Sequence, residues 1–209
     1  MAASTNFTMP VRAQDKTAWH RELLARIALQ QESALAALYS EFGSRVYNTA
    51  IGYLQDAGAA EEVTQDVFVK IYQSAARFEG KSSVSTWIYR ITVNQALDRL
   101  SYGKRQKRFG WMVALFKEDS SMPNVDLPHF DHPGVLLERQ ENARILFKAI
   151  ESLPVQQKTA FILSFMEDLP RQEVAAVMQT SLKAVEALLQ RAKANLRAHL
   201  EGFYPERRI

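Results

Sequence analysis

A cluster of cations close to two aromatic residues could bind both the backbone and the bases of a nucleic acid. Five basic residues lie within ten positions, with no acidic residue among them: Arg99, Lys104, Arg105, Lys107 and Arg108. Clustered cations neutralise phosphates and release counterions, while exposed rings such as Trp87 and Tyr89 can stack on unpaired bases. The pattern therefore suggests contact with partly opened DNA. The alternative is that Trp87 belongs to the core and that the cations form a solubilising helix end, where the helix dipole favours them.

A second candidate site has the pattern of a helix-turn-helix. The segments 171–178 and 182–200 have helical spacing and are separated by three residues. Small Ala175 lets the next helix approach closely, and Ser181 can cap that helix. In such a motif the first residues of the second helix reach base edges in the major groove, and later basic residues contact phosphates. The alternative is an amphipathic helical hairpin with a solvated charged face.

A third polar surface is expected on a helix at 59–76. Glu61, Glu62, Gln65 and Asp66 form an acidic and amidic face opposite the apolar residues of that helix. A charged face is usually only solvated, but it could equally dock a protein partner. Both interpretations stay open at this level.

Helices must position all of these residues, because no segment shows convincing two-residue alternation. Apolar residues recur at helical spacing from about Trp19 to Leu54, and further helices are expected at 59–76, 87–100 (ending near Gly103), 135–152, 155–167, 170–178 and 182–200. The serines between Gly80 and Trp87 can cap the helix that follows them. We predict an all-α fold of two small helical bundles joined by a flexible linker, the second ending in the helix-turn-helix. The expected domains are a flexible N-terminal arm (1–18), a first bundle (19–103), a linker (104–134) and a second bundle (135–209).

The composition of the 209 residues excludes several classes of protein. The absence of cysteine excludes a disulfide framework and any Cys-ligated zinc or iron–sulfur site. No apolar run approaches the ~20 residues needed to span a bilayer, and the N-terminus lacks the apolar core of a signal peptide. The net charge of +3 is compatible with a nucleic-acid partner without establishing one. We therefore expect a soluble protein of the cytoplasm with no direct membrane insertion.

An enzyme has little support in this sequence. The chain has no phosphate-binding glycine loop, no cysteine nucleophile, and no convincing pair of carboxylates or His-rich helix. His129 and His132 are spaced for a metal, but two histidines in a Pro-rich segment are better explained as incidental. We therefore expect no catalytic residues, no metal and no cofactor.

Three segments, in the right order and at the right separation, resemble the conserved regions of small, extracytoplasmic-function (ECF) sigma factors of the sigma-70 family. Residues 60–72 (AEEVTQDVFVKIY) resemble the region-two helix that grips the clamp helices of the largest polymerase subunits. Residues 78–98 (FEGKSSVSTWIYRITVNQALD) resemble the stretch that recognises and melts the −10 promoter element. Residues 153–200, with SLKAVE at 181–186 and QRAKANL at 190–196, resemble region four, which reads the −35 element. The likeness covers about 25–100 and 136–200, and we see no region one or three.

The resemblance implies roles for individual residues. Core RNA polymerase would be bound by Glu62, Gln65, Asp66, Phe68, Val69 and Tyr72. The −10 element would be bound by Lys81, Ser82, Ser83, Ser85, Trp87, Arg90, Asn94, Arg99, Lys104 and Arg105. The −35 duplex would be contacted by Arg171, Ser181, Lys183, Glu186, Ala187, Gln190, Arg191, Lys193 and Arg197. The loop 79–85 would hold a flipped −10 base, because a base outside the stack can be read on its pairing edge.

Four positions in the second bundle depart from the family pattern. Pro170 stands where many relatives have a capping Ser or Thr, and Gln179 replaces the usual turn glycine at a cost on the order of 1 kcal/mol. Ala184 and Glu186 stand where a Thr and a Lys are common. Glu186 could accept a hydrogen bond from a cytosine amine, but it weakens the attraction of the helix for phosphates. The −35 sequence preference of relatives therefore does not transfer.

The resemblance implies a non-enzymatic sigma factor that binds core RNA polymerase, directs it to promoter DNA and helps to melt the −10 element. It places the protein in the bacterial cytoplasm, at the nucleoid during initiation, and implies control by an anti-sigma factor. Two alternatives stay open: a helix-turn-helix repressor or activator with a helical sensor or dimerisation domain, which would not need the 60–72 pattern, and a helical adaptor for proteins only. The apolar segment 109–116 could pack onto either bundle, thread along polymerase or dock an anti-sigma factor.

Overall fold

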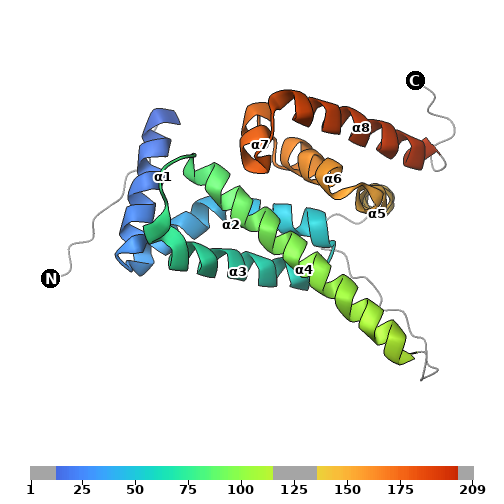
Figure 1. Cartoon of the computed structure of the whole chain (residues 1–209), viewed down its shortest axis with the longest axis horizontal. Coiled ribbons are helices and arrows are strands. Elements are labelled where there is room, and N and C mark those ends of the chain that lie inside the picture. The colour runs from blue at the N-terminus through green and yellow to red at the C-terminus, as the bar shows by residue number, and fades with distance from the viewer. Residues whose placement is uncertain (1–12, 115–135, 202–209) are drawn as a thin grey trace.

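The computed structural model describes the backbone of residues 13–114 and 136–201, and within these ranges the side chains of residues 16–102 and 144–201. Throughout these ranges the regular structure is helical (Figure 1), in the order α1 (Ala13–Ala28), α2 (Glu32–Leu54), α3 (Ala57–Ser74), η1 (Ala75–Arg77), α4 (Val84–Ala114), α5 (Leu136–Ser152), α6 (Val155–Phe161), η2 (Ile162–Met166), α7 (Arg171–Met178) and α8 (Leu182–Glu201). Here η1 is a 3-10 turn and η2 is a π-helical turn. The predicted all-α fold is confirmed. Among the described residues, no helix is both long and apolar enough to cross a membrane.

The first bundle packs α1 to α4 around an apolar stripe of α2. Leu38, Phe42 and Val46 follow one another at intervals of four residues and are buried. Such spacing places the side chains on one face of a helix, and α2 packs closely on α3 and α4. Asp56 caps α3 by accepting a hydrogen bond of 2.7 Å from the backbone N–H of Ala59. This bundle is the rigid base for the polar face of α3 and for the first turns of α4.

The second bundle packs α5, α6 and α7 against α8. Val185 and Leu189 of α8 are buried in its core. Between α7 and α8, Gln179 takes the left-handed conformation, with a φ of 53°, that the turn requires. Ser181 then caps α8, because its Oγ accepts a hydrogen bond of 3.2 Å from the backbone N–H of Ala184. The predicted helix-turn-helix and its cap are thus present in the structure.

The two bundles pack against each other, with α7 on α4 and η2 on α2 (Figure 1). Buried residues of both bundles form one continuous apolar core. Gly52 of α2 permits the close approach, because a Cβ at this position would lie 3.0 Å from Sδ of Met166 and 3.3 Å from Cδ1 of Ile162. This contact between the bundles was not predicted from the sequence.

Helix boundaries differ from the predicted ones in three places. The helix α1 begins at Ala13, so the end of the predicted arm (1–18) is helical, and a left-handed Gln30 (φ 59°) separates α1 from α2. The helix predicted to end near Gly103 continues instead to Ala114. A glycine inside a helix costs only about 1 kcal/mol, which the good helix formers around it can offset. The rest of the predicted linker (104–134), including both of its histidines and the end of the apolar segment 109–116, lies outside the described residues.

Candidate nucleic-acid interface

The loop before α4 is organised by its own serines. Ser83 caps α4, since its Oγ accepts a hydrogen bond of 3.0 Å from the backbone N–H of Thr86 and lies 2.8 Å from Thr86 Oγ1. Gly80 takes a left-handed φ of 71°, which a residue with a side chain rarely adopts. The other loop residues predicted to bind DNA are partly or fully exposed: Lys81, Ser82 and Ser85. The loop therefore combines a constrained backbone with accessible polar groups.

Of the two aromatic residues expected to stack on bases, only Trp87 is available. Trp87 is half-buried, and its ring centroid lies 5.3 Å from that of Phe78. Tyr89 is buried, and its hydroxyl donates a hydrogen bond of 2.9 Å to Oε2 of Glu167. Residues two apart on a helix point to different sides, so the two rings cannot share one surface. The stacking role suggested for Tyr89 is therefore wrong.

Arg90 and Asn94 lie one turn apart on α4, beside a cleft of about 280 Å³ between α4 and the second bundle. The guanidinium of Arg90 donates from Nη2 and Nε to the carbonyl oxygen of Ala176, at 2.6 and 3.2 Å. Ala176 belongs to the last turn of α7, where a cation is favoured by the helix dipole. Asn94 remains exposed at the cleft. One predicted DNA contact is thus engaged by the other bundle.

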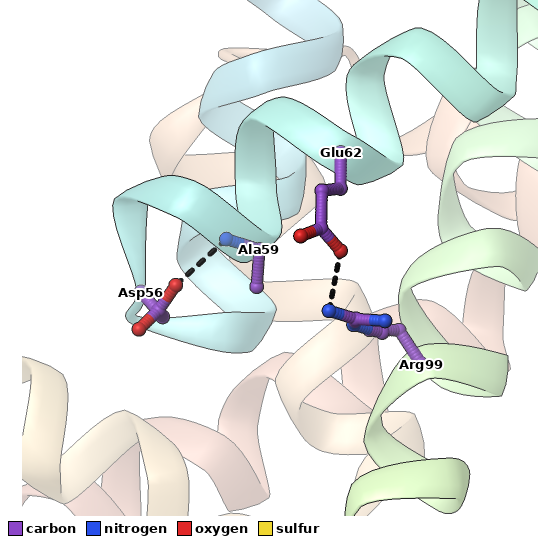
Figure 2. A network of polar contacts seen from close by, with 4 residues as sticks. All are labelled: Asp56, Ala59, Glu62 and Arg99. Carbon is purple, nitrogen blue, oxygen red and sulfur yellow. Dashed lines mark hydrogen bonds and ion pairs between the residues drawn. The ribbon is translucent and has the colours of Figure 1, made fainter. Parts of the chain in front are cut away.

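Arg99 is paired with Glu62, so a residue predicted to bind DNA is held by one predicted to bind polymerase. Figure 2 shows this ion pair between α4 and α3, next to the Asp56 cap that starts α3. Both paired side chains are largely exposed, and exposed pairs of this kind exchange partners at little cost. Lys104 and Arg105 lie further along α4, with side chains outside the described residues.

The polar face of α3 carries five of the six residues predicted to bind polymerase: Glu62, Gln65, Asp66, Val69 and Tyr72. Phe68, the sixth, is buried, with its ring centroid 4.8 Å from that of Tyr39. Tyr39 itself is 53% exposed and Val69 is 55% exposed. Tyr39 and Gln65 help to line a groove of about 640 Å³ between α2 and α3, and Val69 follows Gln65 by one turn of α3. Helical periodicity from Trp19 to Leu54 does not by itself distinguish a core ring from one at the edge of the core, such as Tyr39.

The helix α8 presents most residues predicted to contact the −35 duplex, all exposed except the half-buried Ala187: Lys183, Glu186, Ala187, Gln190, Arg191, Lys193 and Arg197. Arg171 at the start of α7 approaches this face, and its Nη1 lies 3.5 Å from Oε1 of Glu186. Lys193 lies over the ring of Phe165, 4.7 Å from its centroid. The two helices of the motif thus share one polar surface.

Comparisons with known proteins agree with this arrangement. A family model described as Sigma-70 region 2 matches residues 38–106, and another described as Sigma-70, region 4 matches residues 143–196. The first match contains the face of α3 and the serine loop, and the second contains the helix-turn-helix. The ECF RNA polymerase sigma factor RpoE of Cereibacter sphaeroides is 32% identical over 191 residues, which cover 89% of this chain and 97% of that one.

Two solved structures share the fold. CnrH, in complex with the cytosolic domain of CnrY, aligns with a TM-score of 0.63 at 23% identity, covering 88% of this chain and 98% of that chain. The sigma factor RpoE of Bartonella quintana, in complex with the anti-sigma factor NepR, aligns with a TM-score of 0.54 at 18% identity, covering 79% and 97%. These structures bear on the fold alone, whereas the two family models and the Cereibacter relative bear on descent. This chain belongs to the ECF RNA polymerase sigma factors of the sigma-70 family.

Proposed function

We propose that this sigma factor binds core RNA polymerase through one face of α3, reads and melts the −10 element with the loop 79–85 and α4, and contacts the −35 duplex with α7 and α8. The main support is the placement, within one bundle, of an exposed docking face beside a capped polar loop. The functional domains would be 19–103 and 135–209. Such a protein has no catalysis of its own and would act in the bacterial cytoplasm, at the nucleoid during initiation.

Polymerase docking is supported by the mixed character of the α3 face. Gln65 and Asp66 lie one turn before the exposed Val69 on α3. Tyr39, which lines the groove from α2, adds a second exposed apolar side chain. Specific protein interfaces combine an apolar or aromatic centre with a polar rim. A face that is only solvated has no use for two large exposed apolar side chains, Val69 and Tyr39.

Binding of the −10 element is supported by the loop 79–85 and the ring of Trp87. The constrained loop exposes serine hydroxyls that can pair with the edge of an unstacked base. The half-buried Trp87, backed by Phe78, offers one ring for stacking. Lys81 is held by Glu79 as Arg99 is held by Glu62, and both cations can exchange these carboxylates for phosphates with release of counterions.

Binding of the −35 duplex is supported by the ordered start of α8. The Ser181 cap fixes the first turn, from which Lys183 and Glu186 project. Such residues reach base edges in a helix-turn-helix. Glu186 also holds Arg171, so it positions a cation that can contact the adjacent phosphate.

Control by an anti-sigma factor is part of the proposal. It is supported by the fold, since a solved sigma factor of similar fold is bound to the anti-sigma factor NepR. A helix-turn-helix repressor or activator is less favoured. Such a protein would need neither the region 2 match nor the exposed docking face on α3.

The test is run-off transcription by core polymerase on a library of bacterial promoters. We expect specific initiation with the chain present, and loss of both initiation and core binding in Asp66→Arg, because a cation replaces an acid in the docking face. Glu22→Arg is the matched control, a charge reversal at an exposed residue of α1. If no template is transcribed more specifically than by core alone, the sigma function is wrong. If Asp66→Arg and Glu22→Arg bind core equally, the docking face is wrong.

A further inference from the structure

The contact between the two bundles contains a hydrogen bond that is closed to solvent. The hydroxyl of Tyr53 on α2 donates to Oγ1 of Thr159 on α6 at 2.6 Å, and the two residues are only 1% and 5% exposed. Thr159 in turn donates to the carbonyl of Val155 at 2.9 Å, so its hydroxyl both accepts and donates a hydrogen bond. A buried donor without its acceptor is strongly disfavoured, and separating the bundles is tolerable only because water then replaces the bond.

A second set of contacts joins α4 to α7 and to Glu167, which precedes α7. Tyr89 donates to Glu167, and Arg90 donates twice to the carbonyl of Ala176. A third polar contact runs from Nε2 of Gln55 to the carbonyl oxygen of Phe147, at 2.6 Å. These bonds specify the relative orientation of the bundles, which apolar packing alone would leave less defined.

The closed arrangement cannot serve both promoter elements at once. Sites near −35 and −10 are separated by about 25 base pairs, or roughly 85 Å of duplex. In the structure α7 touches Arg90, and α8 has only 20 residues, about 30 Å of helix. The surfaces assigned to the two elements therefore lie within a few tens of ångströms of each other.

We propose that the free chain holds itself closed through an interbundle latch, consisting of Tyr53–Thr159, Tyr89–Glu167 and Arg90–Ala176, and that this latch must open for promoter binding. The closed state stands on the contacts alone, while the need for opening rests on the proposed function. Arg90 is the shared element, because the Nε and Nη2 donors that bind the carbonyl of Ala176 are not available to the −10 strand while that contact lasts. Capture of Arg90 by DNA therefore removes a latch contact, and closing the latch withdraws a DNA contact.

A wedge at Gly52 tests the latch. The three atoms nearest to a Cβ at Gly52 all belong to the second bundle, so Gly52→Gln should push the bundles apart while leaving the first bundle helical. Gly58→Gln is the matched control, because Gly58 is an exposed helical glycine whose Cβ would meet only Oδ1 of Asp56 at 3.6 Å. The chain has no cysteine, so Ala36→Cys on α2 and Ala198→Cys on α8, both exposed positions, can carry spin labels for pulsed dipolar distance measurements.

We expect one narrow distance distribution for the free chain and for Gly58→Gln, and a broad, longer one for Gly52→Gln. Adding core polymerase and promoter DNA should lengthen the distance in the unsubstituted chain. If the free chain is already as broad as Gly52→Gln, the latch is wrong, even if run-off transcription succeeds. If the free chain is closed but supports no transcription, the sigma function is wrong and the closed state stands.

Thr159→Val provides a second test that does not depend on the wedge. It leaves the hydroxyl of Tyr53 without its acceptor in the closed state, which should raise the ratio of open to closed chains about tenfold. Tyr53→Phe should raise it less, because Thr159 keeps its bond to Val155. Equal distance distributions in Thr159→Val and the unsubstituted chain would overturn the assignment of this bond to the latch.

Discussion

The two proposed DNA-binding surfaces of this sigma factor differ in how their cations are engaged in the free protein. On the proposed −10 surface, Arg90 is bound by the second bundle and Arg99 by a carboxylate of α3. On the proposed −35 surface, Arg171 is paired with Glu186 of the same bundle, and Lys183 and Arg197 are exposed on α8. The difference indicates that −10 binding depends on a rearrangement within the protein, whereas the −35 surface is already accessible.

This difference suits the two kinds of DNA involved. Stacking and charge, which act on any unpaired strand, contribute to −10 binding beside the reading of a base edge, so a permanently open −10 surface would also attract other unpaired strands. A surface that binds duplex DNA discriminates between sequences through base edges in the groove. Masking such a surface in the free protein therefore adds less to its specificity. Substitutions that affect one surface and spare the other test this difference.

The largest effect is expected at Arg90. Arg90→Ala should lower specific transcription by about ten- to a hundredfold, because charged hydrogen bonds to DNA are lost, and it should also raise the open fraction by removing the Ala176 contact. Arg90→Lys should be intermediate in both respects, since an ammonium cannot donate in the same planar fork. Run-off transcription and the interbundle distance measure the two effects. Loss of transcription without any opening would show that Arg90 is not part of the latch.

Lys183 is the contrasting test on the second bundle. Lys183→Ala should weaken binding to a −35 duplex about tenfold, as expected for a residue at the start of a recognition helix. The distance between the two bundles in Lys183→Ala should stay as in the unsubstituted chain, because Lys183 lies on the exposed face of α8. Fluorescence anisotropy with duplex DNA measures the affinity. If the bundles separate in Lys183→Ala, the −35 surface is coupled to opening as the −10 surface is, and the proposed difference between them is wrong.

A smaller effect is expected from pH, acting through the latch contact of Glu167. Burial raises the pKa of this carboxyl to about 7 from an ordinary 4.5, although the hydrogen bond from Tyr89 and the charge of Arg45 on α2 both lower it. Burial also raises the pKa of Tyr89 well above its usual range, so that its hydroxyl stays protonated. Closing therefore takes up a proton between pH 4.5 and 7.

Because the closed form binds this extra proton, closure is strongest below the ordinary pKa of the Glu167 carboxyl, 4.5. It weakens as the pH rises through the raised pKa of about 7. The ratio of open to closed chains should increase about three- to tenfold between pH 6 and pH 8. Glu167→Gln, which is neutral like the protonated acid, should stay closed and lose the pH response. Distance distributions recorded across this range give the ratio. A response that persisted in Glu167→Gln would assign it to another group.

The smallest effect is expected at Glu186. Glu186→Gln releases Arg171 and removes a negative charge from the −35 surface, so nonspecific duplex affinity should rise about threefold with a steeper salt dependence. The sequence preference should change as well if the carboxylate accepts from a cytosine amine. Both the salt dependence and the sequence preference are tested by measuring affinity for a promoter duplex and for a random duplex at several salt concentrations. A uniform loss of affinity would instead show that positioning Arg171 is its main role.

Local features of this molecule were predictable from sequence. Serine before an apolar periodic segment predicted the caps at Ser83 and Ser181, and both are formed. Gln179 was recognised as occupying a left-handed turn position, which it does. These features depend on a few neighbouring residues, so spacing and residue type are sufficient to identify them.

Features set by tertiary contacts were not predictable. Nothing in the sequence indicates that Arg90 meets a carbonyl of α7 or that Tyr53 meets Thr159, because the partners are far apart in the chain. Tyr89 was expected on the surface but is buried and bonds to Glu167 of the second bundle. The extension of α4 beyond Gly103 was missed because glycine was taken as a stop, although its helical cost is small.

Permanganate footprinting of core polymerase with this chain on promoter DNA tests promoter melting itself, since permanganate oxidises unpaired thymines. We expect reactive thymines near −10 and a protected duplex near −35 in the same complex, with both lost in Asp66→Arg. A protected −35 duplex with no reactive thymines would contradict this expectation, because that is the footprint of a helix-turn-helix repressor.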